Sequence, residues 1–286
     1  MENKAAVGEI VRLTSADQAS VYAFLAASPI ENVMLMGLIL EEGLQNHIYR
    51  EWIGYREGKR LLAVACISGD ISIYAPEERA IAPIAEYALR RVPLVPRIIS
   101  RKETVDRFFE VFKRVDLPVL FDRHQLVYTL DPGQLIQRAS APVRPARVDE
   151  ALQVARLASA MSYEEIQMDP LADHGQGYVQ LIEDRIRRQR YFVLEEQGVL
   201  KFQVQLNSIT PYAGQITGVY TPPEFRGQGY GTRGMAEFCR LAFTIVPRLC
   251  LFVNDFNLPA RKVYEHLGFR QCMEYRAIFM QEPIQA

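Results

Sequence analysis

The stretch EFRGQGYGTRG, from Glu224 to Gly234, combines four glycines and two arginines in eleven residues. Glycine lets the main chain adopt positive φ angles and approach a ligand closely. A helix that begins at such a loop adds free N–H groups and the positive end of its dipole. The arginines add positive charge beside it. This combination predicts a loop that binds phosphate.

Two well-known phosphate loops fit this stretch poorly. A Walker loop needs a Lys followed by Ser or Thr after its last glycine, and no such pair follows here. The dinucleotide fingerprint G-x-G-x-x-G is present at Gly229, Gly231 and Gly234, with Asp255 at a tolerable distance for a ribose contact. In that fingerprint the strand runs straight into the first glycine, whereas residues 221–228 intervene here. A nicotinamide or flavin site therefore stays an alternative interpretation.

The residues around the loop indicate a third interpretation of the glycine loop. The spacing R-x-x-G-x-G starts at Arg226, and about 26 residues after the loop comes NLPARKVYEHLGF, which reads N-x-x-A-x-x-x-Y-x-x-x-G-F from Asn257. Together with GVYTPPEFRGQGYG, this sequence closely resembles the acyl-CoA-binding core of the GNAT superfamily of N-acetyltransferases. The clear resemblance extends from Val193 to Met280. The resemblance implies direct transfer of an acyl group from acyl-CoA, most commonly acetyl from acetyl-CoA, to an amine in a ternary complex.

The resemblance also implies a set of residues that bind coenzyme A. A bulged strand before the loop would offer its main-chain groups to the pantetheine arm. The loop amides would hold the pyrophosphate, with Arg226 fixing the loop, and an Asn at the start of the next helix would contact pantetheine. Arg261 could reach the phosphates. The expected set is Val219, Tyr220, Arg226, Gly227, Gln228, Gly229, Tyr230, Gly231, Thr232, Asn257 and Arg261.

The Tyr of the second motif, Tyr264, would stand near the thioester sulfur and act as general acid. A phenol with a pKa of about 10 can donate a proton to a departing thiolate whose conjugate acid has a pKa of about 8.5.

A general base is harder to find. Many GNAT enzymes carry a Glu or a water-holding residue on the strand before the loop, where this chain has Gln215 and Thr217. Candidate carboxylates elsewhere are Glu164, Glu165 and Asp169, and an amine that arrives neutral needs no strong base. We expect the acceptor to contact Glu164, Glu165, Gln215 and Asn254.

The elements that position these residues occur in two similar halves. VRLTSADQASVYAFL from Val11 and VRPARVDEALQVARLA from Val143 both predict a strand followed by a helix, and each is followed by a hairpin pattern around Gly58 or Gly198. Proline and glycine between residues 130 and 145 indicate a boundary. We expect an α/β fold of mixed sheets in two tandem GNAT-like domains: a degenerate domain at 1–134, where APEERA replaces the glycine loop, and the coenzyme-binding domain at 135–286.

Composition and charge limit the classes of binding partner that we expect. The net charge of −1 provides no field for nucleic acid, and EDRIRRQR at residues 183–190 is typical of a solvated helix face. No apolar stretch reaches the roughly 20 residues that span a bilayer. Four scattered cysteines favour a reducing cytoplasm, and the histidines show no metal-ligand spacing. We expect a cytoplasmic enzyme without metal that acts on a small-molecule amine; a non-catalytic module that binds or senses coenzyme A is the alternative.

Overall fold

The structure is a computed structural model that describes residues 8–91, 97–113, 118–136, 139 and 141–280. The chain forms two compact units: unit 1 is residues 1–127 with 273–286, and unit 2 is residues 128–272. Both units combine helices with a mixed sheet, so the predicted mixed α/β class is confirmed.

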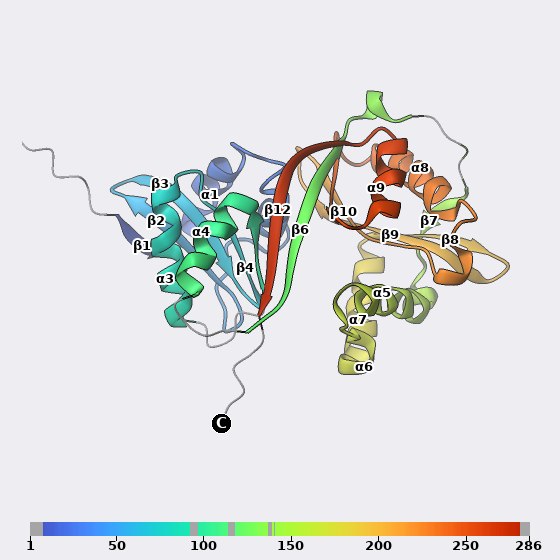
Figure 1. The fold of residues 1–286 in the computed structure, drawn as a ribbon, viewed down its shortest axis with the longest axis horizontal. Coiled ribbons are helices and arrows are strands. Elements are labelled where there is room, and N and C mark those ends of the chain that lie inside the picture. The colour runs from blue at the N-terminus through green and yellow to red at the C-terminus, as the bar shows by residue number, and fades with distance from the viewer. Residues whose placement is uncertain (1–7, 92–96, 114–117, 137–138, 140, 281–286) are drawn as a thin grey trace, which may run out of the picture. The chain divides into compact units, whose positions relative to one another are not determined.

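The first half of the chain contributes ten of the helices and strands that Figure 1 traces. In chain order they are β1 (Glu9–Arg12), α1 (Gln18–Leu25), α2 (Val33–Glu42), β2 (Glu51–Glu57), β3 (Arg60–Ile67), β4 (Asp70–Tyr74), α3 (Ile81–Arg91), β5 (Arg97–Arg101), α4 (Lys102–Phe112) and β6 (Val119–Leu130).

The second half adds five helices and six strands among the described residues. They are β7 (Val143–Pro145), α5 (Ala151–Ile166), α6 (Pro170–His174), α7 (Gln176–Arg187), β8 (Tyr191–Glu196), β9 (Val199–Ile209), β10 (Gly214–Tyr220), α8 (Tyr230–Ala242), β11 (Leu249–Asn254), α9 (Leu258–His266) and β12 (Arg270–Met280).

The two units share one strand order. In unit 1, β1, β2, β3 and β4 pair antiparallel in sequence and β4 then pairs parallel with β5. In unit 2, β7, β8, β9 and β10 repeat that antiparallel series, and β10 pairs parallel with β11. The parallel step requires a crossover helix, which is α3 in unit 1 and α8 in unit 2.

Two strands belong partly to the unit built mainly from the other half of the sequence. Residues 275–279 of β12 pair antiparallel with β5, so the last strand of the chain extends the sheet of unit 1. The end of β6, from Tyr128 to Leu130, belongs to unit 2, where β6 lies beside β11. From the sequence, each of these strands is expected to lie wholly in its own half, with one boundary near residue 135. The described chain instead divides at two points, after Val127 and after Cys272.

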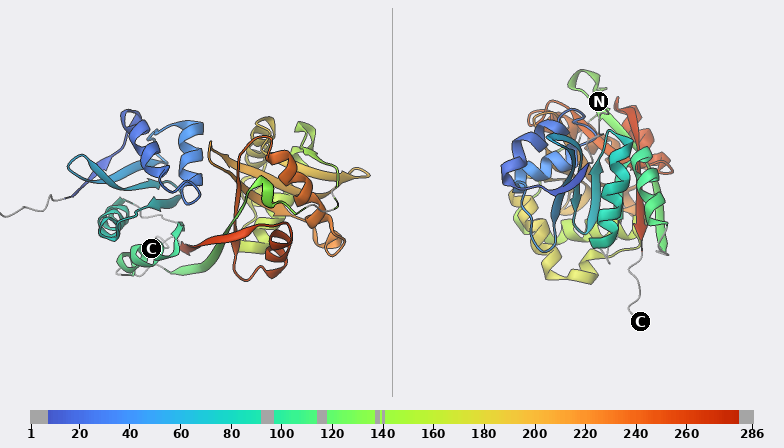
Figure 2. Two further views of the ribbon diagram at one scale, coloured as in Figure 1. Left: turned by 90° about the horizontal axis from the view of Figure 1, so that it is seen from above. Right: turned by 90° about the vertical axis from the view of Figure 1, so that its left-hand side faces the viewer.

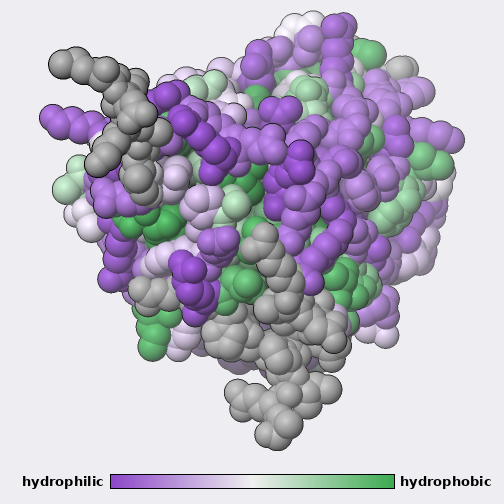
Figure 3. Space-filling model, turned by 60° about the vertical axis from the view of Figure 1, so that its left-hand side comes forward, coloured by the Kyte–Doolittle hydropathy of each residue, from purple (hydrophilic) through white to green (hydrophobic). Residues whose placement is uncertain are grey.

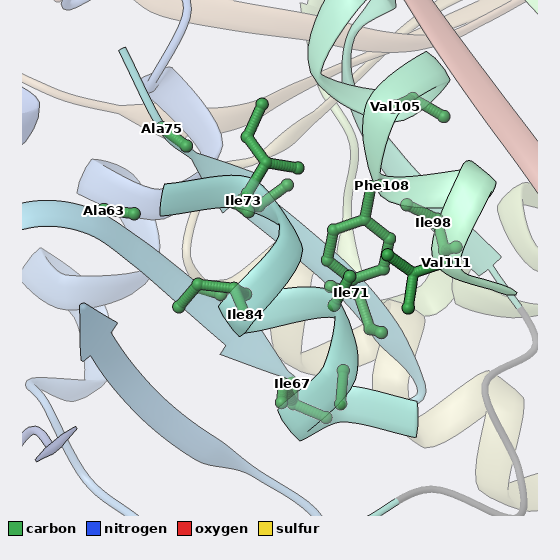
Figure 4. Close-up of a cluster of buried hydrophobic side chains, with 14 of the residues drawn as sticks. Ala63, Ile67, Ile71, Ile73, Ala75, Ile84, Ile98, Val105, Phe108 and Val111 are labelled. Carbon is green, nitrogen blue, oxygen red and sulfur yellow. The ribbon is translucent and has the colours of Figure 1, made fainter. Parts of the chain in front are cut away.

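Unit 1 buries apolar side chains on both faces of its sheet. Helices α1 and α2 cover one face, and α3 and α4 cover the other (Figure 2). Strand β3 serves both layers because successive side chains alternate: Val64 and Cys66 face α1 and α2, and Ala63, Ala65 and Ile67 face the other pair. Figure 4 shows Phe108 of α4 packed among isoleucines of the strands in this second layer.

Unit 2 has the same layers, with α8 and α9 on one side of the sheet and α5, α6 and α7 on the other (Figure 1). Strand β9 is unusual because only one of its faces is apolar. Phe202, with Val204 and Leu206 at the following alternate positions, faces α8 and is completely buried. The opposite face presents Gln203, Gln205 and Asn207 toward α5 and α7. A polar strand face beneath helices marks this side of unit 2 as chemically distinct.

Hydrophilic side chains dominate the face in Figure 3, where apolar side chains form small separated groups. Among the described residues, no helix combines the length and the apolar character that a membrane span needs.

Packing of α8 against the sheet depends on Gly234. A Cβ at this position would lie 2.6 Å from Cδ1 of Phe202, whose ring is completely buried. We expect Gly234→Ala to lower the free energy of unfolding by about 1–3 kcal/mol through overpacking. Gly231→Ala, also in α8, is the matched control, because its Cβ would meet only Thr221 Oγ1 at 3.5 Å. Urea unfolding of both variants measures the difference; equal stabilities would contradict this packing argument.

Candidate active site

Strand β10 separates from β11 partway along its length. The parallel pairing covers only Gly214 to Ile216, although β10 continues to Tyr220. On its other edge β10 stays with β9, through a bulge between Thr217 and Tyr220 at which Gly218 has a φ of +62°. The bulge that the resemblance implies is therefore present. Residues 217–220, which include Val219, have no counterpart in the register with β11, so a second chain of amide groups can pair with this edge.

The glycine loop follows directly and ends in a helix. Gly227 and Gly229 have φ angles of +75° and +82°, which favour glycine, and α8 begins at Tyr230. Within the described part of the chain, the main-chain N–H groups of residues 227–232 donate to no protein acceptor. Six free donors at a helix N-terminus form a cradle that suits an anion with several oxygens. Gln228 and Tyr230 belong to this stretch, and the Tyr230 hydroxyl donates to Glu196 at 2.7 Å, which fastens the loop to β8.

Arg226 does not point away from the protein but binds helix α5. Its Nη2 donates to both carboxylate oxygens of Glu164, at 3.0 and 2.7 Å, and its Nε donates to the Thr221 carbonyl at 2.9 Å. The Tyr220 hydroxyl donates to the same carboxylate at 2.6 Å. One carboxylate thus joins α5, the end of β10 and the glycine loop.

These contacts determine the protonation state of the Glu164 carboxyl. Burial raises the pKa of the Glu164 carboxyl, but the hydrogen bonds from Tyr220 and Arg226 outweigh it, so the pKa lies below its usual range. Burial and the bond to Glu164 together raise the pKa of Tyr220 to about 12. Glu164 is therefore a stable anion that anchors the loop and a weak base.

Tyr264 lies on α9 with 6% of its surface exposed, between the rings of Tyr128 and Phe269. Its hydroxyl has no hydrogen-bond partner among the described residues. Burial, and then the charge of Glu165, raise its pKa, so the phenol keeps its proton at neutral pH. A buried phenol without a protein partner can donate to a ligand atom.

The other motif residues of α9 lie on its first two turns. Asn257 is the N-cap, and its Oδ1 accepts from the Ala260 amide at 3.2 Å, which leaves its Nδ2 directed elsewhere. Asn254, at the end of β11, accepts from the Asn257 amide through its carbonyl. Arg261 donates to the Asp255 carbonyl at 2.8 Å and to the Tyr128 hydroxyl at 3.4 Å. These bonds direct Arg261 toward the β11–α9 turn.

The two further candidate carboxylates differ in position. Asp169 caps the short helix α6 by accepting from the Ala172 amide, and the hydroxyl of Ser159 also donates to it. The bond from Ser159 is the main cause of its lowered pKa. Glu165 is exposed at the last turn of α5, close enough to Tyr264 to act on its pKa. Of the two, Glu165 is the carboxylate that the fold brings toward the proposed acid.

Gln215 is buried on the polar face of the sheet, where its Oε1 accepts from Asn207 and Ser208 at 3.4 Å. Gln215 is a residue predicted from the sequence, whereas its neighbours Gln205 and Asn207 are not. Their signal is visible in KFQVQLN, because amide residues alternate with apolar ones across a strand that is otherwise buried.

Two further cations lie beside the loop, of which the sequence predicted Arg233 but not Lys201. Arg233, one turn into α8, stacks over the Tyr230 ring at 5.1 Å, and Lys201 lies 3.5 Å over the Phe225 ring. No acidic group among the described residues pairs with either side chain. Within the described ranges no cluster of His, Cys, Asp and Glu is arranged to hold a metal ion.

Comparison with known proteins agrees with this geometry. Residues 158–269 match the acetyltransferase (GNAT) family. These residues form a GNAT acetyltransferase domain. They hold the bulged strand, the glycine loop and Tyr264, together with the α5 carboxylates. No curated protein matches the chain.

Solved structures extend the likeness over the whole chain. A GNAT-family acetyltransferase from Colwellia psychrerythraea aligns with a TM-score of 0.62 at 14% identity, covering 95% of this chain and 99% of the other. A Drosophila protein aligns with 0.69 at 13%, covering 96% and 98%. A tandem GNAT protein from the clavulanic acid biosynthesis pathway aligns with 0.57 at 13%, covering 98% and 100%. At these identities the likeness concerns the fold.

The pKa of Glu164 tests the link between α5 and the loop. We expect its carboxyl to titrate below an ordinary Glu, to rise in Arg226→Gln and in Tyr220→Phe, and to exceed the ordinary value when both donors are removed, because burial then acts alone. Carboxyl-labelled NMR titration measures it, with the Glu164→Gln spectrum giving the assignment. Arg233→Gln is the control and should leave the titration unchanged; an ordinary pKa in the wild type would contradict the contacts.

Proposed function

We propose that the protein is an N-acyltransferase that moves an acetyl group from acetyl-CoA to a small-molecule amine by direct transfer in a ternary complex. The observation that carries this proposal is the set of free main-chain N–H groups at residues 227–232, at the end of a strand that has separated from its parallel neighbour. The first feature suits a pyrophosphate and the second suits an amide-containing arm. Their succession matches coenzyme A better than a dinucleotide, because η5 (Pro223–Phe225) and Arg226 intervene between strand and glycines.

The residues fit such a ligand without rearranging the fold. A Cβ on Gly227 would meet nothing within 4 Å, so the glycine there serves an open surface and not packing. Arg233 and Lys201 add positive charge beside the amides. The edge of Val219 and Tyr220 would pair with the pantetheine amides, and the Asn257 amide group would contact the same arm.

Acetyl-CoA supplies an acyl group activated as a thioester. As the amine nitrogen forms its bond to the carbonyl carbon and the carbon–sulfur bond breaks, Tyr264 donates its phenolic proton to the departing thiolate. The raised pKa keeps the Tyr264 phenol protonated at neutral pH, so its O–H can hydrogen-bond to the sulfur as negative charge develops there. The buried ring between Tyr128 and Phe269 holds the hydroxyl in position.

The proton lost by the amine goes to Glu165 or to water. Glu165 is the α5 carboxylate whose charge reaches Tyr264, whereas Glu164 is held by Arg226 and Tyr220. The phenolate left on Tyr264 then recovers a proton from the Glu165 side of the site. Asn254 and Gln215 would line the acceptor pocket.

We further propose that unit 1 is a degenerate GNAT-like domain that binds no coenzyme. Its strand order repeats that of unit 2, but the turn after β4 carries no glycine. The last β4–β5 pair is Ser72 with Ile99, and just beyond it the Ser100 hydroxyl donates to the Ile73 carbonyl. This bond ties β4 to β5 at the point where a coenzyme site would need the two strands apart. These features support a single coenzyme site in each chain.

Calorimetric titration with acetyl-CoA tests the coenzyme site. We expect one molecule to bind per chain, and Gly229→Val to weaken binding by at least about 100-fold because the loop amides lose their orientation. Gly198→Val is the matched control: it also replaces a glycine of positive φ with open surroundings, at the β8–β9 hairpin. Absence of binding by the wild type would refute the proposal, and two molecules per chain would refute the degenerate role of unit 1.

Tyr264→Phe tests the general acid. We expect kcat to fall by about 100-fold or more while the affinity for acetyl-CoA stays unchanged. The wild-type rate should show no loss from phenol ionisation between about pH 6 and 9, because the pKa of Tyr264 is raised above its ordinary value near 10. Tyr128→Phe is the control on the neighbouring ring. Thiol release from acetyl-CoA in an amine screen measures the rates; full activity in Tyr264→Phe would remove it from the mechanism.

A second candidate is a module that binds or senses coenzyme A without catalysis. The observation that favours it is the absence of a carboxylate from β10, where Gln215 and Thr217 stand instead. Stoichiometric acetyl-CoA binding combined with no turnover across a broad amine panel would support this candidate over the enzyme.

A further inference from the structure

The polar face of unit 2 is a continuous hydrogen-bonded row. Thr217 donates to Gln205 at 3.2 Å, Gln205 donates to Asn207 at 3.4 Å, and Asn207 donates to Gln215 at 3.4 Å. Gln205 and Gln215 are 6% and 3% exposed. The row leads along the sheet to the point where β10 leaves β11, and it consists of amides and a hydroxyl without a charge.

One cation enters this row from the helix side. Arg185 of α7 is half-buried, and its Nη1 donates to Asn207 Oδ1 at 2.9 Å. The next arginines of α7 behave differently: Arg187 and Arg188 pair with Glu183 and Asp184 one turn back. Arg185 has no acidic partner in the described part of the chain. Its neighbourhood includes the phenols of Tyr178 and Tyr191, on whose pKa values its charge acts.

A half-buried guanidinium with one amide partner keeps donors that a ligand can use. It carries five N–H donors in a planar fork, and a neutral amide oxygen accepts from one of them. Loss of water around the charge costs free energy that a neutral partner only partly restores. A planar carboxylate would accept from the remaining fork in two parallel bonds. A single guanidinium among neutral groups also matches a single negative charge better than a phosphate.

From this arrangement we propose that the acceptor of the enzyme is an amine that carries a carboxylate, and that Arg185 binds that carboxylate. Asn207 orients the guanidinium, and the amide row separates the bound carboxylate from the amine at the reaction site. This inference rests on the proposed function and gives its acceptor a chemical class. Arg185 is then the residue that determines specificity.

Matched pairs of amines test the proposal. Each pair consists of an amino acid with a side-chain amine, such as lysine or ornithine, and the corresponding decarboxylated diamine; aminoalkyl phosphates of similar length form a third set. Acetylation of each is followed by thiol release from acetyl-CoA. We expect the carboxylate-bearing member to have the higher kcat/KM, by about 10- to 100-fold, through a lower KM.

The variant Arg185→Gln should abolish this preference while leaving the decarboxylated amines and the affinity for acetyl-CoA unchanged. Arg187→Gln is the matched control, because it removes a charge from the same helix where Glu183 already pairs with it. Arg185→Lys should restore only part of the preference, since it keeps the charge and loses the fork.

The outcomes separate the two proposals. If acetyl-CoA binds but the carboxylate gives no advantage, if the phosphates are preferred, if the preference survives Arg185→Gln, or if no carboxylate-bearing amine is acetylated, the inference about the acceptor is wrong. If acetyl-CoA does not bind at all, the proposed function itself fails. Loss of acetyl-CoA binding in Arg185→Gln would indicate a structural role for this side chain and would also overturn the inference.

Discussion

The site depends on one interrupted pairing, the separation of β10 from β11 after Ile216. Parallel strands normally satisfy each other's main-chain groups along their whole overlap. Here the bulge at Gly218 turns the end of β10 while β9 continues to support it. The edge of β10 that is left open is available to pair with an amide-containing ligand, and the strand end directs Tyr220 toward α5 and leads the chain into the glycine loop.

The electrostatics of the site follow from main-chain dipoles more than from net charge. Arg226 is neutralised by Glu164, so a bound phosphate would be attracted mainly by the free amides at the start of α8, with support from Arg233 and Lys201. The amide row on the opposite face of β9 and β10 carries no charge, and Arg185 is the cation that bonds to it. In the proposed enzyme this division would give one side of the strand edge to a polyanionic coenzyme and the other side to a smaller polar acceptor.

Local spacing predicts the parts of this site that lie close together in the sequence. The glycine loop, the second motif and the hairpin at Gly198 are each encoded within a few residues, and the family match and the structure agree with them. Contacts between distant segments left no comparable signal. Nothing in HQLVYTL indicates that the end of β6 joins unit 2, and nothing in a run of arginines separates the inward Arg185 from its solvated neighbours. Glu164 was found as a carboxylate, but its bond to Arg226 spans 62 residues.

The glycines of the loop differ in whether packing of the fold requires them. Gly234 is needed for packing, because any side chain there meets Phe202. Gly227 packs against nothing, yet it holds a φ that other residues resist. Unit 1 supports the same strand order with Glu, Arg and Ala at the corresponding turn, so the architecture does not demand such glycines. Glycines that cost conformational entropy without serving the packing are explained most simply by a ligand that lies against their amides.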